Sequence, residues 1–449
     1  MDLNISKYNL FIEENESFYI YNLLNTSIFK TTYSLFSFLK QNERTHNKII
    51  STQFSKKMLD YLISNRIIYK ENEDELDYMK FKHFKDKYDS SYLSVVVMPT
   101  LKCNLSCHYC YEKEKSISIT DEQMSTLKLF FQKQSIKKKN IVVRWSGGEF
   151  LTKWKEVRQL SNFIIQQCEI NNCTFLASAI SNGTLITPKI VDEMDECHIK
   201  SVQITLDGGK DIHNKIRFTK NKKGTFDRII NAIEITSQKL KVIIRVNIDK
   251  NNYSSIDSLF QSLSQSAINK DNVQLFCRPV LCSLSRTPST ELFSHKEFYK
   301  VELHLLELAE KYNLPYAFHW GIHGQSVRCA YNCMEGLYLT PNLNMYKCPI
   351  YVDYEETFAV GHILKNGDFQ INNYKEYLKC LSYSPFKIEE CSNCKVLPIC
   401  HGKCPVLWEQ SGRSNEEGCI PEKFSIEEKI KYALRNQRQL LSLQKSGIL

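Results

Sequence analysis

Three cysteines stand close together in the stretch TLKCNLSCHYCYEK. Cys103, Cys107 and Cys110 have the spacing C-x3-C-x2-C and follow directly after the apolar run at 92–99. Thiolates are soft ligands that suit iron–sulfur clusters, and short spacings let one loop supply three corners of a cluster. A cubane of four irons needs four outer ligands, so three cysteines leave one iron open, as a catalytic zinc keeps an open position. We expect a reactive metal site here, with a zinc site as the alternative.

A second group of eight cysteines lies between residues 329 and 419. Four of them form the run CSNCKVLPICHGKC, with the spacing C-x2-C-x5-C-x3-C. Eight thiols are the number that two fully ligated cubanes need, although C-x2-C pairs also suit tetrahedral zinc. Closed clusters next to an active site would carry electrons. The eight are Cys329, Cys333, Cys348, Cys391, Cys394, Cys400, Cys404 and Cys419.

The chain is rich in cysteine, with 17 among its 449 residues. A chain of this length divides into about two or three domains and does not need disulfides to stabilise its core. The N-terminus lacks a secretory signal, and no stretch reaches the ~20 apolar residues of a membrane span, so we expect a cytoplasmic protein. Outside the two groups we expect inert buried thiols at Cys168, Cys173, Cys197, Cys277, Cys282 and Cys380.

The formal net charge is +9. The basic runs KKKN at 137–140 and KNKK at 220–223 are interpreted as solvated loops rather than as a nucleic-acid patch. A basic surface would equally suit an acidic peptide. We therefore expect neither nucleic acid nor a membrane as a partner.

Strand-like and helix-like segments alternate from residue 92 to about 312. Near-continuous apolar strands separated by helices imply a parallel sheet covered by helices, either as a barrel or as an open doubly wound sheet. In both arrangements the chemistry gathers at the carboxyl ends of the strands, where the three cysteines lie. The strand candidates are 92–99, 140–145, 174–181, 200–207, 241–249 and 272–280.

Residues 1–90 are predicted to form a separate α+β unit. Two alternating apolar runs around the polar turn EENES predict a hairpin, and segments with helical spacing follow at 32–42 and 53–68. The acidic stretch YKENEDELDY at 69–78 is predicted to lead out of this unit.

The last part of the chain loses the alternation of strands and helices. Residues 316–424 contain the eight clustered cysteines and are predicted to be rich in loops. Residues 425–449 are predicted to form one helix, with Ser425 as its N-cap and Glu428 three residues further on.

The loop CNLSCHYC resembles the cysteine loop of radical S-adenosylmethionine (SAM) enzymes, including the aromatic Tyr109 before the last cysteine. WSGGEF, AISNGTLI and ITLDGGKDIHNKIR resemble the segments that follow the next strands in that family, so the likeness covers roughly residues 92–290. The resemblance implies a partial (β/α)6 TIM-like barrel at 91–315. It also implies a [4Fe-4S] cluster whose open iron binds SAM, with Tyr109 against the adenine.

The same resemblance implies further contacts to SAM. Gly147 and Gly148 lack side chains, so backbone groups can approach a ligand closely, and Glu149 can accept hydrogen bonds from an ammonium group. In the family, this segment holds the methionine amine. Thr205 and Arg217 would contact the ribose and the methionine carboxylate. Taken alone, Gly-Gly-Glu is typical of a turn, and Arg217 could pair with a surface acid.

The eight-cysteine region resembles the SPASM extension that follows the barrel in many radical SAM enzymes that modify peptides. In those relatives the ligands of two auxiliary [4Fe-4S] clusters interleave along the chain, so the resemblance implies three clusters in all. It assigns the first auxiliary cluster to Cys329, Cys333, Cys348 and Cys404, and the second to Cys391, Cys394, Cys400 and Cys419.

The implied activity is that of a peptide maturase. One electron from a reducing partner such as flavodoxin or ferredoxin would cleave SAM to a 5′-deoxyadenosyl radical, which would take a hydrogen from a ribosomally made precursor peptide. The auxiliary clusters would carry away a further electron, and a thioether or carbon–carbon crosslink would form. Residues 1–90 resemble the small winged-helix elements that bind leader peptides, in which the leader adds a strand to a sheet edge.

Two other functions fit part of the sequence. Anaerobic sulfatase-maturing enzymes of the same family carry an aspartate, thought to act as a base, directly after the cysteine equivalent to Cys348, and here that residue is Pro349. A non-enzymatic zinc or iron–sulfur protein that binds nucleic acid would explain the positive charge but not the ordered barrel segments. The sequence names no catalytic base.

Overall fold

The computed structural model describes most of the chain, and every structural statement below concerns the residues that it describes. None of the helices in these residues is both long and apolar enough to span a membrane. The described residues are 2–45, 49–107, 110, 116–280, 292–317, 329–352, 356–410 and 418–435.

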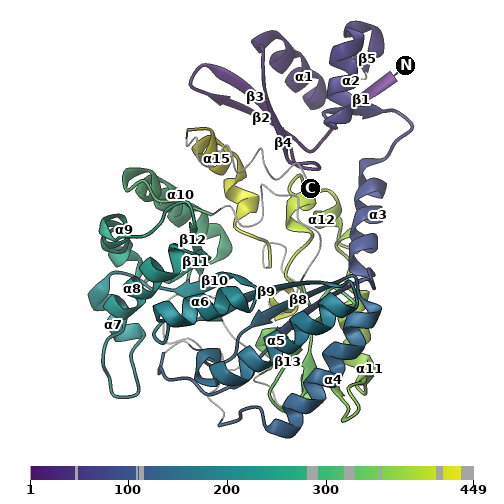
Figure 1. Ribbon diagram of the computed structural model, residues 1–449. Helices are drawn as coiled ribbons and strands as arrows, with labels where there is room; N and C mark the ends of the chain where they lie inside the picture. Colours follow the sequence, from purple (N-terminus) through teal and green to yellow (C-terminus); the bar gives the residue numbers. More distant parts are fainter. Residues whose placement is uncertain are drawn as a thin grey trace.

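A ten-stranded sheet forms the centre of the molecule (Figure 1), and six of its neighbouring strands are parallel. The six lie in chain order across the sheet, which confirms the six strand candidates and the partial (β/α)6 barrel. They are β7 (Tyr92–Val97), β8 (Asn140–Trp145), β9 (Thr174–Ser181), β10 (Ile199–Thr205), β11 (Lys241–Ile248) and β12 (Val273–Pro279).

Helices cover the outer face of these strands, because alternate strand residues are apolar and buried. In β8, Ile141, Val143 and Trp145 lie in the main core, whereas the intervening Arg144 is exposed on the other face. Capping boxes fix where two helices begin, at Thr120 for α4 and at Ser294 for α10. The helices are α4 (Asp121–Lys137), α5 (Trp154–Ile170), α6 (Pro188–Glu196), α7 (Lys210–Ile216), α8 (Phe226–Ser237), α9 (Ile256–Gln265) and α10 (His295–Lys311).

The eight-cysteine region extends the barrel sheet instead of forming only loops. Strand β13 pairs in parallel with β7, and β14, β15 and β16 continue from it as an antiparallel meander. Short helices follow. The elements are β13 (Gly336–Leu339), β14 (Asn344–Tyr346), β15 (Gly361–Ile363), β16 (Phe369–Ile371), α11 (Tyr374–Ser382), α12 (Glu389–Ser392), α13 (Leu397–Cys400) and α14 (Pro405–Gln410).

The last described helix, α15 (Glu422–Arg435), begins earlier than the sequence predicts. Ser425 is therefore not the N-cap: it lies inside the helix, and its Oγ donates to the buried carboxylate of Glu302 at 2.7 Å. Glu302, Glu422, Lys429 and Arg278 form one buried ion network between α10, α15 and β12. The requirement to pair these buried charges outweighs the capping signal at Ser425.

The N-terminal unit contains two small sheets and three helices. The predicted hairpin is confirmed as β2 and β3, whose turn residues Asn15 and Glu16 both have positive φ, as a tight two-residue turn requires. Its elements are β1 (Asp2–Ile5), β2 (Asn9–Glu14), β3 (Ser17–Asn22), β4 (Ser27–Thr31), α1 (Tyr33–Thr45), β5 (Ile49–Ile50), α2 (Lys56–Ser64), β6 (Ile68–Lys70) and α3 (Glu75–Lys87).

The acidic stretch at 69–78 contains the end of β6 and the start of α3, so it has regular structure. Asp74 caps α3, its carboxylate accepting from the backbone N–H of Leu76 at 2.7 Å. The helix then runs from the N-terminal unit to the barrel (Figure 1). At its end the buried Lys87 donates through Nζ to the carbonyl of Tyr383 at 2.7 Å.

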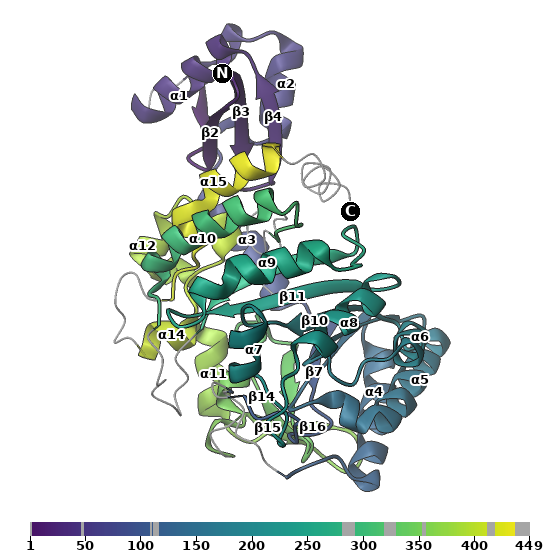
Figure 2. The same ribbon diagram turned by 90° about the vertical axis from the view of Figure 1, so that its left-hand side faces the viewer.

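An apolar cluster joins the N-terminal unit to the eight-cysteine region. Tyr8 and Leu10 of the unit pack with Cys391 and Ile399, and Ile430 of α15 belongs to the same cluster. Figure 2 shows α15 directly below the N-terminal strands and above α10. The unit is therefore anchored to the rest of the molecule through a common core.

Candidate functional site

The three-cysteine loop lies at the carboxyl end of β7, as the sequence predicts. Backbone contacts hold the loop at both ends: the Leu101 N–H donates to the carbonyl of Ile117, and the Ser106 N–H donates to the carbonyl of Phe218, both at 2.9 Å. Leu105 also forms a bridge with Thr219. These backbone contacts tie the loop to the segment after α7.

The thiols of this loop lie in a partly buried, polar surrounding. Burial raises the pKa of Cys103 to about 11, and the nearby Glu149 and Cys107 raise it further. Burial likewise raises the pKa of Cys107, which Arg217 opposes. A bound metal would reverse these shifts, because coordination favours the thiolate. Cys110 is partly buried as well, and Tyr109 lies outside the described residues.

Gly147 and Gly148 follow β8 and bring the next segment against the cysteine loop. The Gly148 N–H donates to Thr100 O at 3.1 Å, and the Glu149 N–H donates to Lys102 O at 2.9 Å. A Cβ on Gly147 would lie 2.3 Å from Thr100 O, and one on Gly148 2.3 Å from Lys102 O. The backbone of the cysteine loop therefore occupies the space that side chains at Gly147 and Gly148 would need.

Glu149 is almost fully buried between the exits of β8 and β9. Its carboxylate accepts from the backbone N–H of Asn182 at 2.7 Å and of Leu151 at 3.2 Å, and from the hydroxyl of Ser181 at 3.1 Å. Burial raises its pKa to about 7. The carboxylate that the resemblance assigns to the SAM amine thus also fixes the end of the third barrel strand.

Asn182 contacts the cysteine loop directly, and sequence reasoning gave it no role. Its Nδ2 lies 3.7 Å from Cys103 Sγ and donates to Asn104 Oδ1 at 2.8 Å. Its Oδ1 accepts from the N–H of Thr184 at 2.9 Å. Asn182 belongs to the segment AISNGTLI, and its position directly after a strand is the sequence feature that could have indicated its role.

Arg217 pairs with a buried acid, not with a surface one. Its guanidinium lies 3.4 Å from the carboxylate of Asp207, which has no solvent exposure. Asp207 also accepts from the backbone N–H of Asn247 at 3.1 Å. Thr205 is buried at the end of β10, two residues before Asp207. The structure therefore gathers Thr205, Asp207 and Arg217 at the same edge of the sheet as the cysteine loop.

A buried histidine fixes the backbone at Arg217. Burial lowers the pKa of His213 to about 3, so the ring is neutral. Its Nδ1 accepts from the N–H of Asp207 at 3.2 Å, and therefore its Nε2 donates to Thr225 Oγ1 at 3.1 Å. Thr225 Oγ1 in turn donates to the carbonyl of Arg217 at 2.8 Å.

The cysteines of the eight-cysteine region fall into two neighbourhoods. Burial raises the pKa of Cys400, and Cys419, Cys394 and Cys391 raise it further, so these four thiols lie close to one another. They are the four that the resemblance assigns to the second auxiliary cluster. This neighbourhood adjoins the N-terminal unit through the cluster of Tyr8, Leu10 and Cys391.

The other neighbourhood contains Cys348. Burial raises the pKa of its thiol, and Cys329, Cys404 and Cys380 raise it further. Cys380, which the sequence places among the inert thiols, is buried here beside the thiols of the first auxiliary set. Cys168, Cys173, Cys197 and Cys277 are buried as expected, and Cys282 lies outside the described residues.

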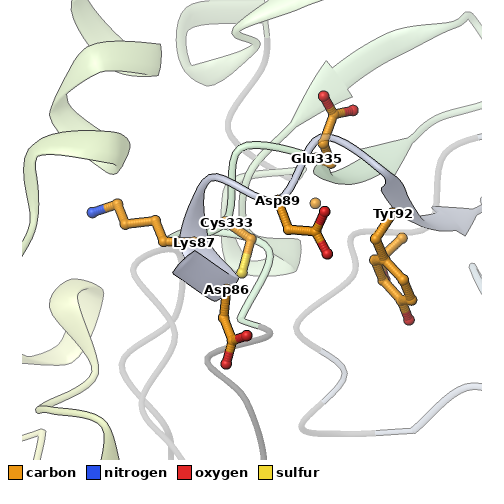
Figure 3. Close-up of a pocket in the computed structure, with 8 residues that line it drawn as sticks. Asp86, Lys87, Asp89, Tyr92, Cys333 and Glu335 are labelled. Atoms are coloured by element: carbon orange, nitrogen blue, oxygen red, sulfur yellow. The ribbon is translucent and has the colours of Figure 1, made fainter. Parts of the chain in front are cut away.

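Cys333 lies at the wall of a small pocket between the end of α3 and the start of β7 (Figure 3). Asp86, Asp89 and Glu335 also line it. The Lys87 side chain extends away from Cys333 in this view. Cys333 and Cys329 are joined by a backbone hydrogen bond of 3.0 Å, so a single turn separates the two thiols.

The donor chemistry fits iron–sulfur clusters, although the described side chains do not yet converge. No three Cys, His, Asp or Glu side chains among the described residues are gathered tightly enough to hold one metal ion. Thiols nevertheless dominate both regions, no described cysteine is in a disulfide, and thiolate is the ligand that such clusters prefer. The ligand sets therefore remain proposals.

An apolar cluster connects the two cysteine regions. Met98 and Leu101, which flank the start of the three-cysteine loop, belong to one core with Tyr331 and Tyr351. Cys348 and Cys404 pack against the same core. The mouth of the barrel and the first auxiliary thiols thus border a common core.

A parallel partial barrel with a thiol loop at the exit of its first strand defines an α/β protein that can hold a metal cluster at its carboxyl edge. Residues 97–263 match the model of the radical SAM superfamily, so the chain contains a radical SAM domain. This match confirms the family that the cysteine loop indicates.

Two curated relatives extend the comparison. The chain is 29% identical over 178 residues to the cysteine-type anaerobic sulfatase-maturating enzyme of Clostridium novyi, a match covering 38% of this chain and 47% of the relative. It is 22% identical over 419 residues to the radical SAM cyclopropyl synthase TigE of Paramaledivibacter caminithermalis, covering 87% of this chain and 83% of that one. The chain thus spans about half the length of the first relative and most of the second.

Two solved structures share the fold. Native anSMEcpe with bound AdoMet and Kp18Cys peptide superposes with a TM-score of 0.58 and 19% identity, over 79% of this chain and 99% of that chain. Streptococcus suis SuiB bound to precursor peptide SuiA gives a TM-score of 0.51 and 14% identity, over 93% of this chain and 98% of that chain. At these identities the likeness concerns the fold, and it includes the partial barrel.

Proposed function

We propose that this chain is a radical SAM peptide maturase that installs a thioether or carbon–carbon crosslink in a ribosomally made precursor peptide. The observation that supports it best is the placement of Cys103, Cys107 and Cys110 at the exit of β7, within a radical SAM domain and beside Glu149 and Arg217. The fold of SuiB, a structure solved with a precursor peptide, covers 93% of this chain.

The cofactors of this proposal are SAM and three [4Fe-4S] clusters. When bound, the open cluster and SAM supply a 5′-deoxyadenosyl radical that removes a hydrogen atom from the peptide. Cys103, Cys107 and Cys110 hold the cluster, and Asn182 donates toward the Cys103 sulfur. Glu149 and Arg217 are placed to accept an ammonium and to donate to a carboxylate, the two ends of an amino-acid group.

The two auxiliary clusters are proposed on the interleaved sets. Cys329, Cys333, Cys348 and Cys404 hold the first, and Cys391, Cys394, Cys400 and Cys419 hold the second. The electrostatic contacts among Cys329, Cys348 and Cys404, and among all four thiols of the second set, support this division. The core that links Met98 and Leu101 to Cys348 supports electron transfer from the barrel to the first cluster.

The N-terminal unit is proposed to bind the leader of the precursor. Its sheet has the order β2-β3-β4, so among the described strands β4 pairs on one side only. An extended peptide can add to such an edge through backbone hydrogen bonds.

A proline in β4 tests this edge. Lys30→Pro removes one backbone N–H and should weaken leader binding by about tenfold or more, because strand addition depends on these groups. The matched control is Gln370→Pro in β16, the outer strand of the large sheet, which should leave leader affinity unchanged. Equal leader affinity in both variants and the parent would refute binding at β4.

The central experiment uses anaerobically purified, reconstituted full-length protein with SAM and dithionite. We expect formation of 5′-deoxyadenosine and about twelve irons per chain, four for each cluster. With a short precursor peptide from a neighbouring reading frame as the test substrate, we expect a product that has lost two hydrogen atoms. Intact SAM under these conditions would remove the proposed function.

Formylglycine formation is the second candidate, supported by the sulfatase-maturating relative at 29% identity. Pro349 occupies the place where those enzymes carry an aspartate, which favours a crosslink. A sulfatase-derived peptide separates the two activities, because formylglycine is an aldehyde that a hydrazide traps. A trapped aldehyde would favour this candidate.

A further inference from the structure

An open cavity of about 450 Å³ lies on one side of the three-cysteine loop. Cys103, whose thiol would hold a corner of the cluster, is one of the residues that line it. Lys102, Lys153 and Lys220 also line it, and none of the described lining residues is acidic. The cavity is therefore a basic approach to the metal site.

The basic run KNKK at 220–223 lies beside the three-cysteine loop, and its first residue, Lys220, lines the cavity. The bridge between Leu105 and Thr219 holds the start of the run against the loop. Lys220, Lys222 and Lys223 are all exposed. Lys153 pairs with Glu156 at 2.8 Å, and Lys102 and Lys220 contribute two further positive charges to the lining.

The proposed SAM contacts are not part of the described cavity wall. Gly147, Gly148, Glu149, Thr205 and Arg217 do not line the cavity. Asn182, which contacts the Cys103 sulfur, is likewise absent from its wall. A partner at the cavity could approach the cluster without displacing SAM or the peptide.

We infer that this basic cavity is the docking site of an acidic one-electron carrier protein, an inference that rests on the proposed function. One electron leaves the reduced cofactor of the carrier, which is oxidised by one electron, and enters the cluster of the three-cysteine loop, which is reduced by one. No atom is transferred. Opposite charges on the two proteins steer the encounter and fix the orientation that brings the two cofactors together.

The composition of the wall favours a protein partner over a nucleic acid. Nucleic-acid grooves combine basic residues with aromatic platforms on which bases stack. The described lining residues are lysines with small polar side chains and Cys103, and none is aromatic. A positively charged wall without aromatic residues, next to a metal site, suits an acidic protein surface.

The test compares two charge-reversal variants of the full-length, reconstituted protein. The first carries Lys220→Glu at the cavity and Lys222→Glu two residues further along the same basic run. The control carries Lys241→Glu and Lys270→Glu. Lys241 is the first residue of β11 and Lys270 lies shortly before β12, so both are at the opposite edge of the sheet. Iron content and thermal unfolding of both should match the parent, because all four side chains reach solvent.

Two measurements are made with flavodoxin as the probe. The affinity of oxidised flavodoxin is measured by calorimetry, and the rate of 5′-deoxyadenosine formation is measured once with reduced flavodoxin and once with dithionite. In the cavity variant we expect affinity and the flavodoxin-driven rate to fall about tenfold or more at low salt. The loss should shrink as salt screens the charges, and the dithionite-driven rate should match the parent.

Each result decides a separate point. Unchanged flavodoxin affinity and rate in the cavity variant, or an equal fall in the control, would overturn the docking site while leaving the proposed function intact. Failure of the parent to cleave SAM with dithionite would overturn the proposed function and this inference with it. If the cavity variant instead loses affinity for a single-stranded oligonucleotide and keeps its affinity for flavodoxin, the cavity is a nucleic-acid site and the inference is wrong.

Discussion

The three-cysteine loop is held by backbone hydrogen bonds to its neighbours, whereas the thiols of the eight-cysteine region are embedded in apolar clusters that also anchor other parts of the chain. Cys103 faces an open cavity, but Cys391 is buried with Tyr8 of the N-terminal unit. The difference teaches that the thiols of the three-cysteine loop serve the chemistry, whereas the thiols of the eight-cysteine region also help to hold the fold together. Removal of the thiols of the three-cysteine loop should leave the fold intact, whereas removal of thiols from the eight-cysteine region should destabilise it.

Removal of the three thiols is the strongest test of this division. Cys103, Cys107 and Cys110 changed together to Ala should reduce 5′-deoxyadenosine formation to background, because no ligand for the open cluster remains. The free energy of unfolding should change by less than about 1 kcal/mol, since backbone hydrogen bonds to neighbouring segments hold the loop in place. Chromatography and chemical denaturation measure the two effects. Residual SAM cleavage would contradict the role of this loop.

Removal of two thiols from the other region should damage structure as well as iron binding. Cys391→Ala with Cys394→Ala should lose about four irons and loosen the apolar cluster under β2 and β3. Amide exchange in these strands should accelerate by about 10- to 100-fold, a loss of local stability of about 1.4–2.8 kcal/mol. The control Cys168→Ala with Cys197→Ala removes buried thiols of the barrel core and should keep all the iron. Unchanged exchange in β2 and β3 would show that the two regions do not differ.

Two single substitutions sharpen the ligand set of the first auxiliary cluster. Cys333→Ala should lose about four irons, whereas Cys380→Ala should keep them, because Cys380 is proposed only to pack beside Cys348. Iron analysis and electron paramagnetic resonance measure the difference. The opposite pattern would move the fourth ligand from Cys333 to Cys380.

A smaller effect is expected from Asn182, whose side chain donates toward the Cys103 sulfur. Asn182→Ala removes a donor 3.7 Å from Cys103 Sγ and should lower SAM cleavage by about 10- to 100-fold. The matched control is Asn162→Ala, whose side chain contacts Cys197, a thiol outside both groups. An equal loss in both variants would indicate a general structural effect rather than one on the cluster.

The smallest effect concerns the pH dependence of the N-terminal unit. Burial raises the pKa of Glu75 from 4.5 to about 7. Between these values the folded chain holds a proton that the unfolded chain has released, so stability falls as pH rises through this range. Glu75→Gln should flatten this dependence by about 1–3 kcal/mol, measured by urea unfolding of both proteins between about pH 5 and pH 8. A parent whose stability rises over that range would contradict the buried state of Glu75.

The barrel was predictable from sequence because its signals are local. Each of the six strands is a short apolar run, and the structure places β8 and β9 at the expected residues. The position of Cys103 after the first strand then follows, since parallel strands present their carboxyl ends at one edge. The site residues Glu149 and Arg217 reach the same edge.

The remaining features depend on contacts between distant segments. The pairing of β13 with β7 joins residues more than two hundred positions apart, and no local pattern encodes it. The start of α15 at Glu422 is set by buried charges on other elements, and Asn182 gains its role only when β9 lies beside the cysteine loop. A buried acid as partner of Arg217 is likewise a property of the packed structure.

The anchoring of the N-terminal unit has a consequence for how a substrate would be measured. Lys87 holds the end of α3, Arg435 of α15 pairs with Glu14, and Lys395 pairs with Glu43, so the unit has several separate fastenings to the body of the molecule. A precursor bound at β4 would then have to span a fixed distance from β4 to the mouth of the barrel. The number of residues between the segment bound at β4 and the modified residue would therefore select the site of modification. A longer spacer in the precursor would move the modification to a different residue.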